Sequence, residues 1–381
     1  MRAIVLKEFQ ELRRDRRTLA LLIVMPLLLL IIFGYAANFT VDHLTVAVYG
    51  SGATTVTKLI DDNAKLKDHL DVVSTDAGGT KTDARNGLRD DKTDVAIVAA
   101  ASNVDVYIDG SNLFAAQSAR TIFAQLQQQV AQQAGKQGQG TASAQQTTTI
   151  TVTTLFNPDL KTSWVMIPAI IGLILTFIGT IITSIGLVRE REAGTLEQLA
   201  VMPLRPSAVV LGKISPYFLL ACFDMALITV LGLLLFGVPF NGDPLIFIVG
   251  AALFLFVVLG LGVLISSVSR TTGQAIQLAF MVLLPQILLS GMIFPLSAMA
   301  AGVRWIGYCL PLTWFTMISQ GVMIRGAGWN SLWFPLVILA AMAVVIFGLA
   351  VVRLSRSISP VKQHEHPETD AQHDAVAEVA R

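Results

Sequence analysis

Long apolar runs separated by polar segments dominate the chain, and their lengths indicate the class of protein. A helix needs about 20 apolar residues to cross a bilayer. Runs of that kind predict six membrane-spanning helices, at Leu19–Ala37, Trp164–Val188, Ile214–Val238, Pro244–Ser269, roughly Thr271–Pro295, and Leu332–Val352. Five of these runs carry no charge, and the third carries only Asp224. The pattern therefore predicts a membrane protein whose transmembrane part is all-α, with spans two to six in a domain over 164–356.

A long hydrophilic segment, 38–163, separates the first span from the second. Alternating or clustered apolar residues predict strands there, at Leu44–Tyr49, Asp94–Ala99, Val104–Ile108 and Ile150–Phe156. Helical periodicity predicts helices at Lys81–Asp90 and Ser111–Gln133. Strands alternating with helices indicate a small α/β domain inserted between spans one and two. Within it, residues 135–148 are rich in Gln, Gly, Ser, Ala and Thr and predict a flexible linker.

Both ends of the chain are polar. Val5, Phe9 and Leu12 recur at helical spacing between basic residues, so residues 1–18 predict an amphipathic helix on the inner membrane surface. The alternative is a signal peptide, because Gly34 to Ala36 resembles a cleavage site. The following apolar run is longer than a usual signal core, which favours an uncleaved anchor. Residues 357–381 predict a disordered tail.

Two interruptions of the apolar pattern predict shorter elements. A charged stretch after the second span turns at Gly194 and restarts as a helix, because Thr195 and Gln198 have the spacing of a capping box. An isolated helix this short is only marginally stable in water. We therefore expect the segment 190–202 to contact a partner in the aqueous phase. Further on, Pro285 and Pro295 interrupt an uncharged run that is too long for one crossing. We expect 294–324 to contain short helices that re-enter the membrane from the outer side.

The distribution of basic residues predicts the orientation, because cytoplasmic loops carry an excess of Lys and Arg. Most of the basic residues near the spans fall on one side of the membrane. They include Arg13, Arg14, Arg16, Arg17, Arg189, Arg191, Arg205, Lys213, Arg270, Arg353 and Arg356. The other side has Lys161, Arg304 and Arg325 close to the spans. We therefore expect both termini in the cytoplasm and 38–163 outside the cell.

Composition narrows the chemistry. The chain is 54% hydrophobic and 14% charged, with a net charge of +1, so nothing indicates a nucleic-acid partner. The signatures Gly-x-Ser-x-Gly, His-Glu-x-x-His and Cys-x-x-Cys are absent from the sequence, and so is a phosphate-binding loop. We expect no metal or cofactor on this chain, and no enzymatic activity. Energy for any transport must then come from a partner or an ion gradient.

A few polar residues inside the spans are candidates for a substrate path. Ionisable side chains in spans are costly and mark ion or substrate pathways. Asp224 is the one such residue, and Gln274, Gln277 and Gln286 follow on the fifth predicted span. The structural alternative is that Asp224 is paired or protonated beside a neighbouring helix, and that the glutamines bond between helices. The sequence leaves both interpretations open.

Several motifs give the chain a family resemblance. They are Phe156–Leu160, Arg189–Leu199, Gly212–Tyr217, Leu284–Gly291, Phe294–Pro295 and Pro311–Phe315. With these motifs the chain resembles the permease subunit of a type-2 ATP-binding-cassette (ABC-2) exporter, in the bacterial multidrug-efflux-like branch with a large extracytoplasmic domain. The resemblance covers nearly the whole sequence.

The resemblance implies a role and partners. It implies that Glu190, Arg191, Glu192, Gly194, Thr195 and Glu197 couple the chain to cytoplasmic ATPase subunits, which hold the ATP and Mg. It also implies a second permease subunit, as homodimer or heterodimer, in a bacterial inner membrane. A drug, lipid or other amphiphile is then exported by alternating access, and the outer domain gates the exit or meets a periplasmic adaptor.

Two other function classes stay open on the sequence alone. One is an ion-gradient-driven carrier that uses Asp224. The other is a membrane-anchored receptor or assembly factor that acts through the outer domain. The carrier would transport with an ion gradient and no ATPase. The receptor or assembly factor would depend on the outer domain over 38–163 and not on the coupling segment.

Overall fold

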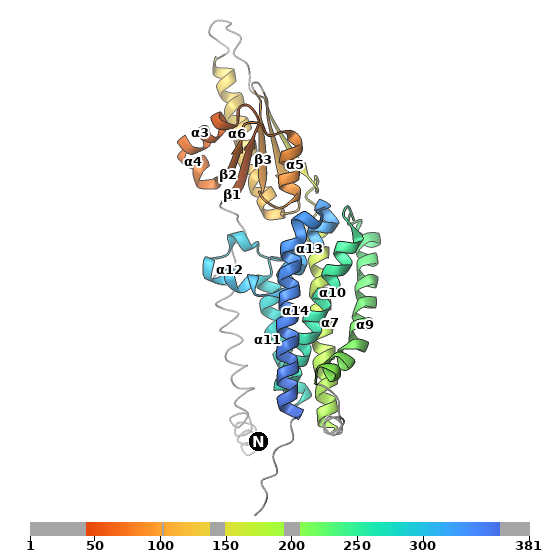
Figure 1. Ribbon diagram of the computed structural model, residues 1–381. Helices are drawn as coiled ribbons and strands as arrows, with labels where there is room; N and C mark the ends of the chain where they lie inside the picture. The colour runs from red at the N-terminus through yellow and green to blue at the C-terminus, as the bar shows by residue number, and fades with distance from the viewer. Residues whose placement is uncertain (1–42, 101–102, 138–148, 194–205, 359–381) are drawn as a thin grey trace, which may run out of the picture.

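A bundle of long helices carries a smaller sheet domain on one of its ends (Figure 1). The structure is a computed structural model that describes residues 43–100, 103–137, 149–193 and 206–358. We call the end of the bundle next to the sheet domain the sheet end, and the opposite end the far end. The predicted interface helix 1–18 and first span Leu19–Ala37 lie outside the described residues.

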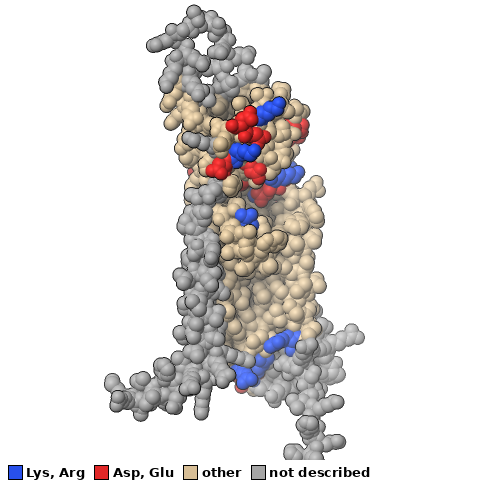
Figure 2. Space-filling view, turned by 90° about the vertical axis from the view of Figure 1, so that its left-hand side faces the viewer, with Lys and Arg blue, Asp and Glu red and all other residues tan. Residues whose placement is uncertain are grey.

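The described part of the bundle has five helices long and apolar enough to cross a membrane. They are α7 (Thr162–Glu192), α9 (Pro206–Phe236), α10 (Pro244–Val268), α11 (Thr272–Leu289) and α14 (Trp329–Ile358). On the face in Figure 2, a broad band of the described bundle surface is almost free of charged residues, and basic residues gather at the far end. The prediction of an all-α membrane part is confirmed.

Close helix contacts hold the bundle together. The central helix α10 packs against α7 and α14 along its length. Small residues allow this approach: a side chain at Gly179 would meet Val258, and one at Gly262 would meet Thr183. At the sheet end Phe254 of α10 stacks on Phe315, with ring centroids 4.4 Å apart.

Four short elements connect α11 to α14. They are η1 (Leu296–Ala298), α12 (Ala301–Tyr308), α13 (Pro311–Gln320) and η2 (Gly321–Arg325). Short helices were predicted here, but α11 ends earlier than the predicted limit at Pro295. The reason is the turn after Leu289, where Gly291 has a left-handed φ of 86° that a continuing helix cannot contain. At its other end α14 extends to Ile358 and so covers the first residues of the predicted tail 357–381.

The sheet domain contains five strands in the order β2-β1-β3-β4-β5. They are β1 (Leu44–Tyr49), β2 (Leu70–Asp76), β3 (Val95–Ala99), β4 (Asn103–Asp109) and β5 (Thr149–Leu155). Strand β1 is parallel to β2 and β3, β4 is antiparallel to β3, and β5 is parallel to β4. The central strand β3 is wholly buried, which explains its uninterrupted apolar sequence.

Helices cover both faces of this sheet. They are α3 (Ala53–Asp62), α4 (Ala64–His69), α5 (Lys81–Arg89) and α6 (Leu113–Gln137). One core lies between the sheet and α3 and α6, and the smaller one between the sheet and α5. Sequence reasoning missed α3, α4 and β2, since β2 is a largely exposed edge strand without an alternating pattern. It also placed a flexible linker over 135–148, whereas α6 continues through Gln137, and 138–148 lie outside the described residues.

Candidate coupling and transport sites

A hydrogen-bonded corner joins the sheet domain directly to the first long helix of the bundle. Between β5 and α7, the buried Asn157 donates from Nδ2 to the Lys161 carbonyl at 3.1 Å and accepts from the Lys161 N–H at 2.9 Å. Phe156 and Leu160 have left-handed φ values of 65° and 49°, which cost free energy for residues with side chains. The corner therefore has a defined shape, and movement of α7 is transmitted to β5.

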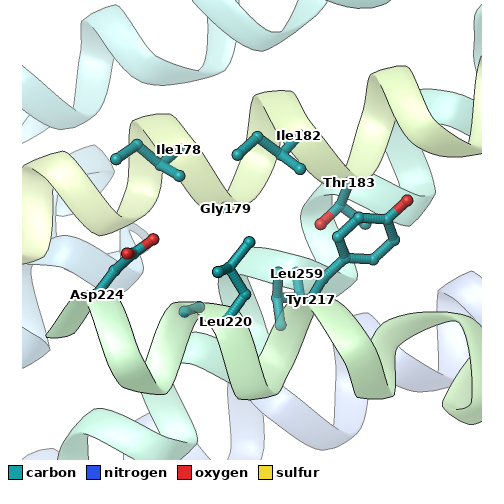
Figure 3. A pocket seen from close by; sticks show the side chains of 9 residues that line it. Ile178, Gly179, Ile182, Thr183, Tyr217, Leu220, Asp224 and Leu259 are labelled. Carbon is teal, nitrogen blue, oxygen red and sulfur yellow. The ribbon is translucent and has the colours of Figure 1, made fainter. Parts of the chain in front are cut away.

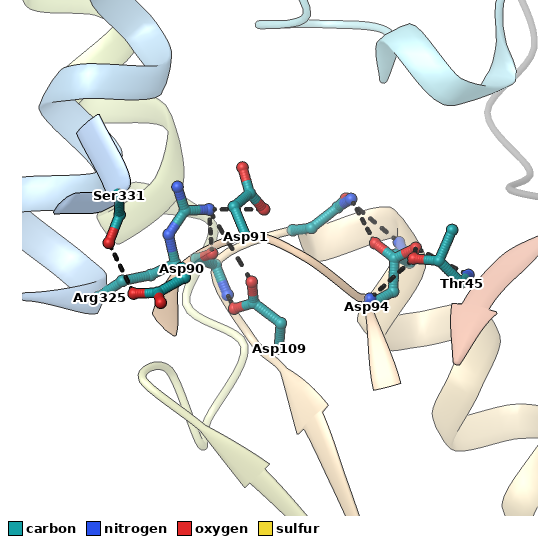
Figure 4. A network of polar contacts seen from close by, with 10 residues as sticks. Thr45, Asp90, Asp91, Asp94, Asp109, Arg325 and Ser331 are labelled. Atoms are coloured by element: carbon teal, nitrogen blue, oxygen red, sulfur yellow. Dashed lines mark hydrogen bonds and ion pairs between the residues drawn. The ribbon is translucent and has the colours of Figure 1, made fainter. Parts of the chain in front are cut away.

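A buried arginine makes the second connection between the bundle and the sheet domain. Arg325 ends η2 and is only 7% exposed. Its Nη1 lies 3.0 Å from Asp91 Oδ1 and 3.9 Å from Asp109 Oδ2. The same nitrogen donates to Ser111 Oγ at 3.3 Å (Figure 4). We call these four residues the Arg325 junction.

The Arg325 junction includes a carboxyl group with a shifted pKa. Asp109 is fully buried, and this burial raises its pKa from 3.8 to about 6, although the nearby Arg325 lowers it. Beside the junction, Ser331 of α14 donates to Asp90 Oδ1 at 2.6 Å. Residues from β4, from the loop before β3 and from two bundle elements thus meet in one polar cluster.

At the far end, α7 is tied to the turn between α10 and α11. Arg191 donates from Nη1 to the carbonyls of Ser266 and Ser269, at 3.2 and 2.9 Å. Glu192 accepts from the Thr272 N–H at 3.0 Å and from its hydroxyl at 3.1 Å. These bonds connect the end of α7 to α10 and α11, so a displacement of this end would also move those two helices.

This arrangement corrects the predicted bounds of the coupling helix, 190–202. Glu190, Arg191 and Glu192 form the last turn of α7 rather than a separate element. The physical reason is that Arg and Glu favour helix and nothing breaks it before Gly194. Gly194, Thr195 and Glu197 lie outside the described residues.

A hollow opens between α7 and α9, and Asp224 lies at one end of it (Figure 3). Its accessible volume is about 10 Å³, room for about one water molecule. Its walls are apolar, with Ile178, Ile182, Leu220 and Leu259 among them. Tyr217 and Thr183 lie at the other end (Figure 3). Within the described part of the chain, the half-buried Asp224 has no hydrogen bond or ion pair.

The three predicted path glutamines do not share this hollow. Gln274 accepts from the Arg270 N–H at 3.1 Å and so helps to close the start of α11. Gln277 is exposed on α11, and Gln286 is fully buried with neither amide atom bonded within the described chain. Of the four predicted residues, Asp224 alone lines the hollow. Among the described residues there is also no group of His, Cys, Asp and Glu that could hold a metal.

Comparison with known proteins identifies the family. A family profile described as "ABC-2 family transporter protein" matches residues 16–352, which is most of the chain. The chain belongs to the ABC-2 transporter family. The resemblance drawn from the sequence motifs is therefore confirmed.

Several curated relatives of this ABC-2 protein are bacterial permeases. It is 28% identical over 353 residues to "Probable multidrug ABC transporter permease YbhR" of Escherichia coli (strain K12), covering 89% of this chain and 94% of the relative. It is 29% identical over 384 residues to "Probable multidrug ABC transporter permease YbhS" of the same strain, covering 94% and 97%. It is also 35% identical over 207 residues to "Inner membrane transport permease YhhJ" of that strain, covering 53% and 54%.

The family and these relatives confirm the main prediction from the sequence. The chain is the membrane permease subunit of an ABC exporter rather than an enzyme. Together with its apolar helices they support a multi-pass protein of the inner membrane.

Sequence reasoning missed several residues of this ABC-2 permease that the structure brings together. Arg325 was noticed only as a basic residue close to the spans, and Asp91 and Asp109 were not noticed. Thr183 was not connected with Asp224, because it lies on α7 and Asp224 on α9. Tyr217 is on α9 as well, and its spacing of seven residues from Asp224 was an available signal that was not used. A charged residue at the end of an uncharged run was the available signal for Arg325.

Proposed function

We propose that this ABC-2 permease exports an amphiphile by alternating access, with α7 as the element that carries motion from a partner ATPase. The observation that carries this proposal is the connection of α7 at both ends. One end continues through the Asn157 corner into β5, and the other is tied to the α10–α11 turn by Arg191 and Glu192. The relatives named as multidrug permeases support an amphiphilic cargo.

The proposed orientation places the far end in the cytoplasm and the sheet domain in the periplasm. Basic residues are more frequent at the far end, where Arg189, Arg191, Arg270 and Arg353 lie, as cytoplasmic loops require. Tryptophan favours the membrane–water interface. All five tryptophans belong to segments at the sheet end, at Trp164, Trp305, Trp314, Trp329 and Trp333. They mark the outer boundary of the membrane, so the periplasmic domain over 38–163 begins immediately above it.

The proposed coupling site lies at the cytoplasmic end of α7. Glu190, Arg191 and Glu192, followed by Gly194, Thr195 and Glu197, meet an ATPase subunit that holds ATP and Mg. Two permeases and two ATPases form the working unit, with the second permease identical or related. The sheet domain then moves with α7 and gates the exit or presents a surface to a periplasmic adaptor.

The proposed substrate path includes Asp224, which lines the hollow beside α7. Movement of α7 against α9 would change this hollow directly, since both helices form its walls. Gln277 and Gln286 remain candidates for other parts of the path, while the contacts of Gln274 favour a structural role.

The test is export by the permease reconstituted in vesicles with its ATPase subunit. We expect the double variant Glu192→Ala with Glu197→Ala to keep ATP hydrolysis but to lose export about tenfold, equivalent to roughly 1.4 kcal/mol of lost coupling. Asp243→Asn is the matched control, because this acid caps α10 at the sheet end and Asn caps equally well. Unchanged export by the double variant would contradict the proposed coupling site.

The same vesicles distinguish the other function classes. Export that needs an ion gradient but no ATPase would favour a carrier that uses Asp224. A cellular function that survives the double variant but is lost on removal of 44–155 would favour a receptor or assembly factor.

A further inference from the structure

We propose that the hollow between α7 and α9 binds a cationic amphiphile, with its amine or quaternary ammonium head at Asp224 and a polar group of its body at Thr183. This inference rests on the proposed export function and names the substrate class of the same site. It is carried by the geometry of the described residues around the hollow (Figure 3).

The first step is the carboxylate. A charge at membrane depth is costly unless it is paired, and Asp224 has no partner in the described part of the chain. The nearest basic residue on its own helix is Lys213, which a helix places about 16 Å away along the axis. The basic residues of α7, Arg189 and Arg191, lie in its last turns at the far end. The partner that neutralises Asp224 must therefore come from outside these helices.

The second step is an unpartnered hydroxyl. Thr183 is 0% exposed, and its Oγ1 has no hydrogen bond in the described chain. Threonine in a helix usually bonds the carbonyl one turn back, as Thr176 does to Gly172 at 2.8 Å. Figure 3 shows the Thr183 oxygen turned toward the hollow, at the end away from Asp224. A buried hydroxyl left unbonded favours a ligand that bonds it.

The third step is the wall between these two polar groups. It is formed by Ile178, Ile182 and Leu220. The ring of Tyr217 adds an aromatic surface at the Thr183 end. Such a wall suits a hydrocarbon or aromatic body and offers a sugar or a peptide nothing to bond.

The fourth step is access. Next to Asp224 on α9, the Phe223 side chain is 65% exposed, and Leu219 is 69% exposed. These residues form an exposed apolar face of α9 beside the hollow. The hollow has room for about one water molecule in this conformation, so an amphiphile enters it when α7 and α9 separate. The carboxylate repels anionic lipids and drugs. A cationic head with an apolar body therefore satisfies the charge, the hydroxyl and the wall together.

The experiment measures binding rather than transport, on the full-length permease in complex with its ATPase and without nucleotide. The probes are three fluorophores with the same dodecyl tail and the same hydrogen-bonding amide in the body, carrying a trimethylammonium, a neutral ether or a sulfonate head. We expect the ammonium probe to bind most tightly. Asp224→Asn should weaken its binding about ten- to a hundredfold, the range for a charge-assisted contact, and leave the neutral probe unchanged.

Matched variants separate the two polar contacts from folding effects. Thr183→Val should weaken the ammonium probe about two- to tenfold, whereas Thr176→Val, an equally buried threonine with a bonded hydroxyl, should not. Asp224→Glu keeps the charge and should retain most of the affinity. A size-exclusion profile equal to the wild type confirms that each variant is folded.

Two results would overturn the inference: equal binding of the ammonium probe by Asp224→Asn and the wild type, or equal binding of all three probes. Failure of the proposed export function looks different. In that case the ammonium probe binds through Asp224, but ATP drives no transport of it in vesicles.

Discussion

Two charged side chains of this permease interrupt long uncharged stretches of the sequence, and their environments are opposite. Arg325 is buried and meets two carboxylates and a hydroxyl at the sheet end. Asp224 is half-buried within the bundle and meets no partner in the described chain. A buried charge that is paired fixes geometry, whereas an unpaired one only adds a cost to folding. The comparison supports a structural role for Arg325 and the proposed ligand-binding role for Asp224.

The strongest way to test this contrast is to remove the arginine. Arg325→Met leaves Asp91 and Asp109 without their cation, and loss of one partner of a buried pair costs about 3–5 kcal/mol. We expect a clear fall in the midpoint of thermal unfolding and faster proteolysis at the β5–α7 corner. Arg89→Met is the control, because Arg89 makes only a partly exposed contact with Asp90 at 3.9 Å. An equal fall in the unfolding midpoint of the two variants would mean that the Arg325 junction contributes no more stability than a surface ion pair.

A pH series tests the same junction through Asp109. Because its folded pKa is raised to about 6, the folded state holds a proton that the unfolded chain releases near 3.8. This contribution to stability is complete below the unfolded pKa and is lost as pH rises through about 6. Its size is on the order of 3 kcal/mol, at about 1.4 kcal/mol per pKa unit.

The measurement is the unfolding midpoint of the wild type and of Asp109→Asn between pH 4 and pH 7.5. The difference between the two curves isolates Asp109, since Asn does not titrate. We expect the wild type to lose stability relative to the variant as pH rises. A flat difference curve would place the carboxyl pKa at its ordinary value and contradict the burial argument.

The smallest expected effect has the opposite sign and concerns Asp224. Removing an unpaired charge relieves a cost, so Asp224→Asn should stabilise the permease by roughly 1 kcal/mol while it weakens cation binding. Thermal unfolding in the absence of any amphiphile measures this. A destabilised Asp224→Asn would show that the carboxylate is structural after all, like Arg325.

The long helices could be predicted because membrane thickness makes run length decisive. Helices α10 and α14 follow their apolar runs closely, and Asp224 was noticed because a single charge interrupts such a run. The Arg325 junction could not be predicted, because Ser111 and Arg325 are 214 positions apart. Thr183 was missed for a related reason, since only the crossing of α7 and α9 makes its hydroxyl face Asp224's hollow. For Gln274 the sequence left a path role and a structural role open, because it did not show the bond that this side chain accepts from the Arg270 N–H.

The Asn157 corner has a mechanical consequence. Helix α7 has 31 residues, which a rise of 1.5 Å per residue makes about 46 Å long. If a helix of this length tilts by about 10° about one end, its other end is displaced by about 8 Å. Because the Asn157 corner follows this helix directly, the proposed tilt of α7 would pull on β5 and load the Arg325 junction at the same time.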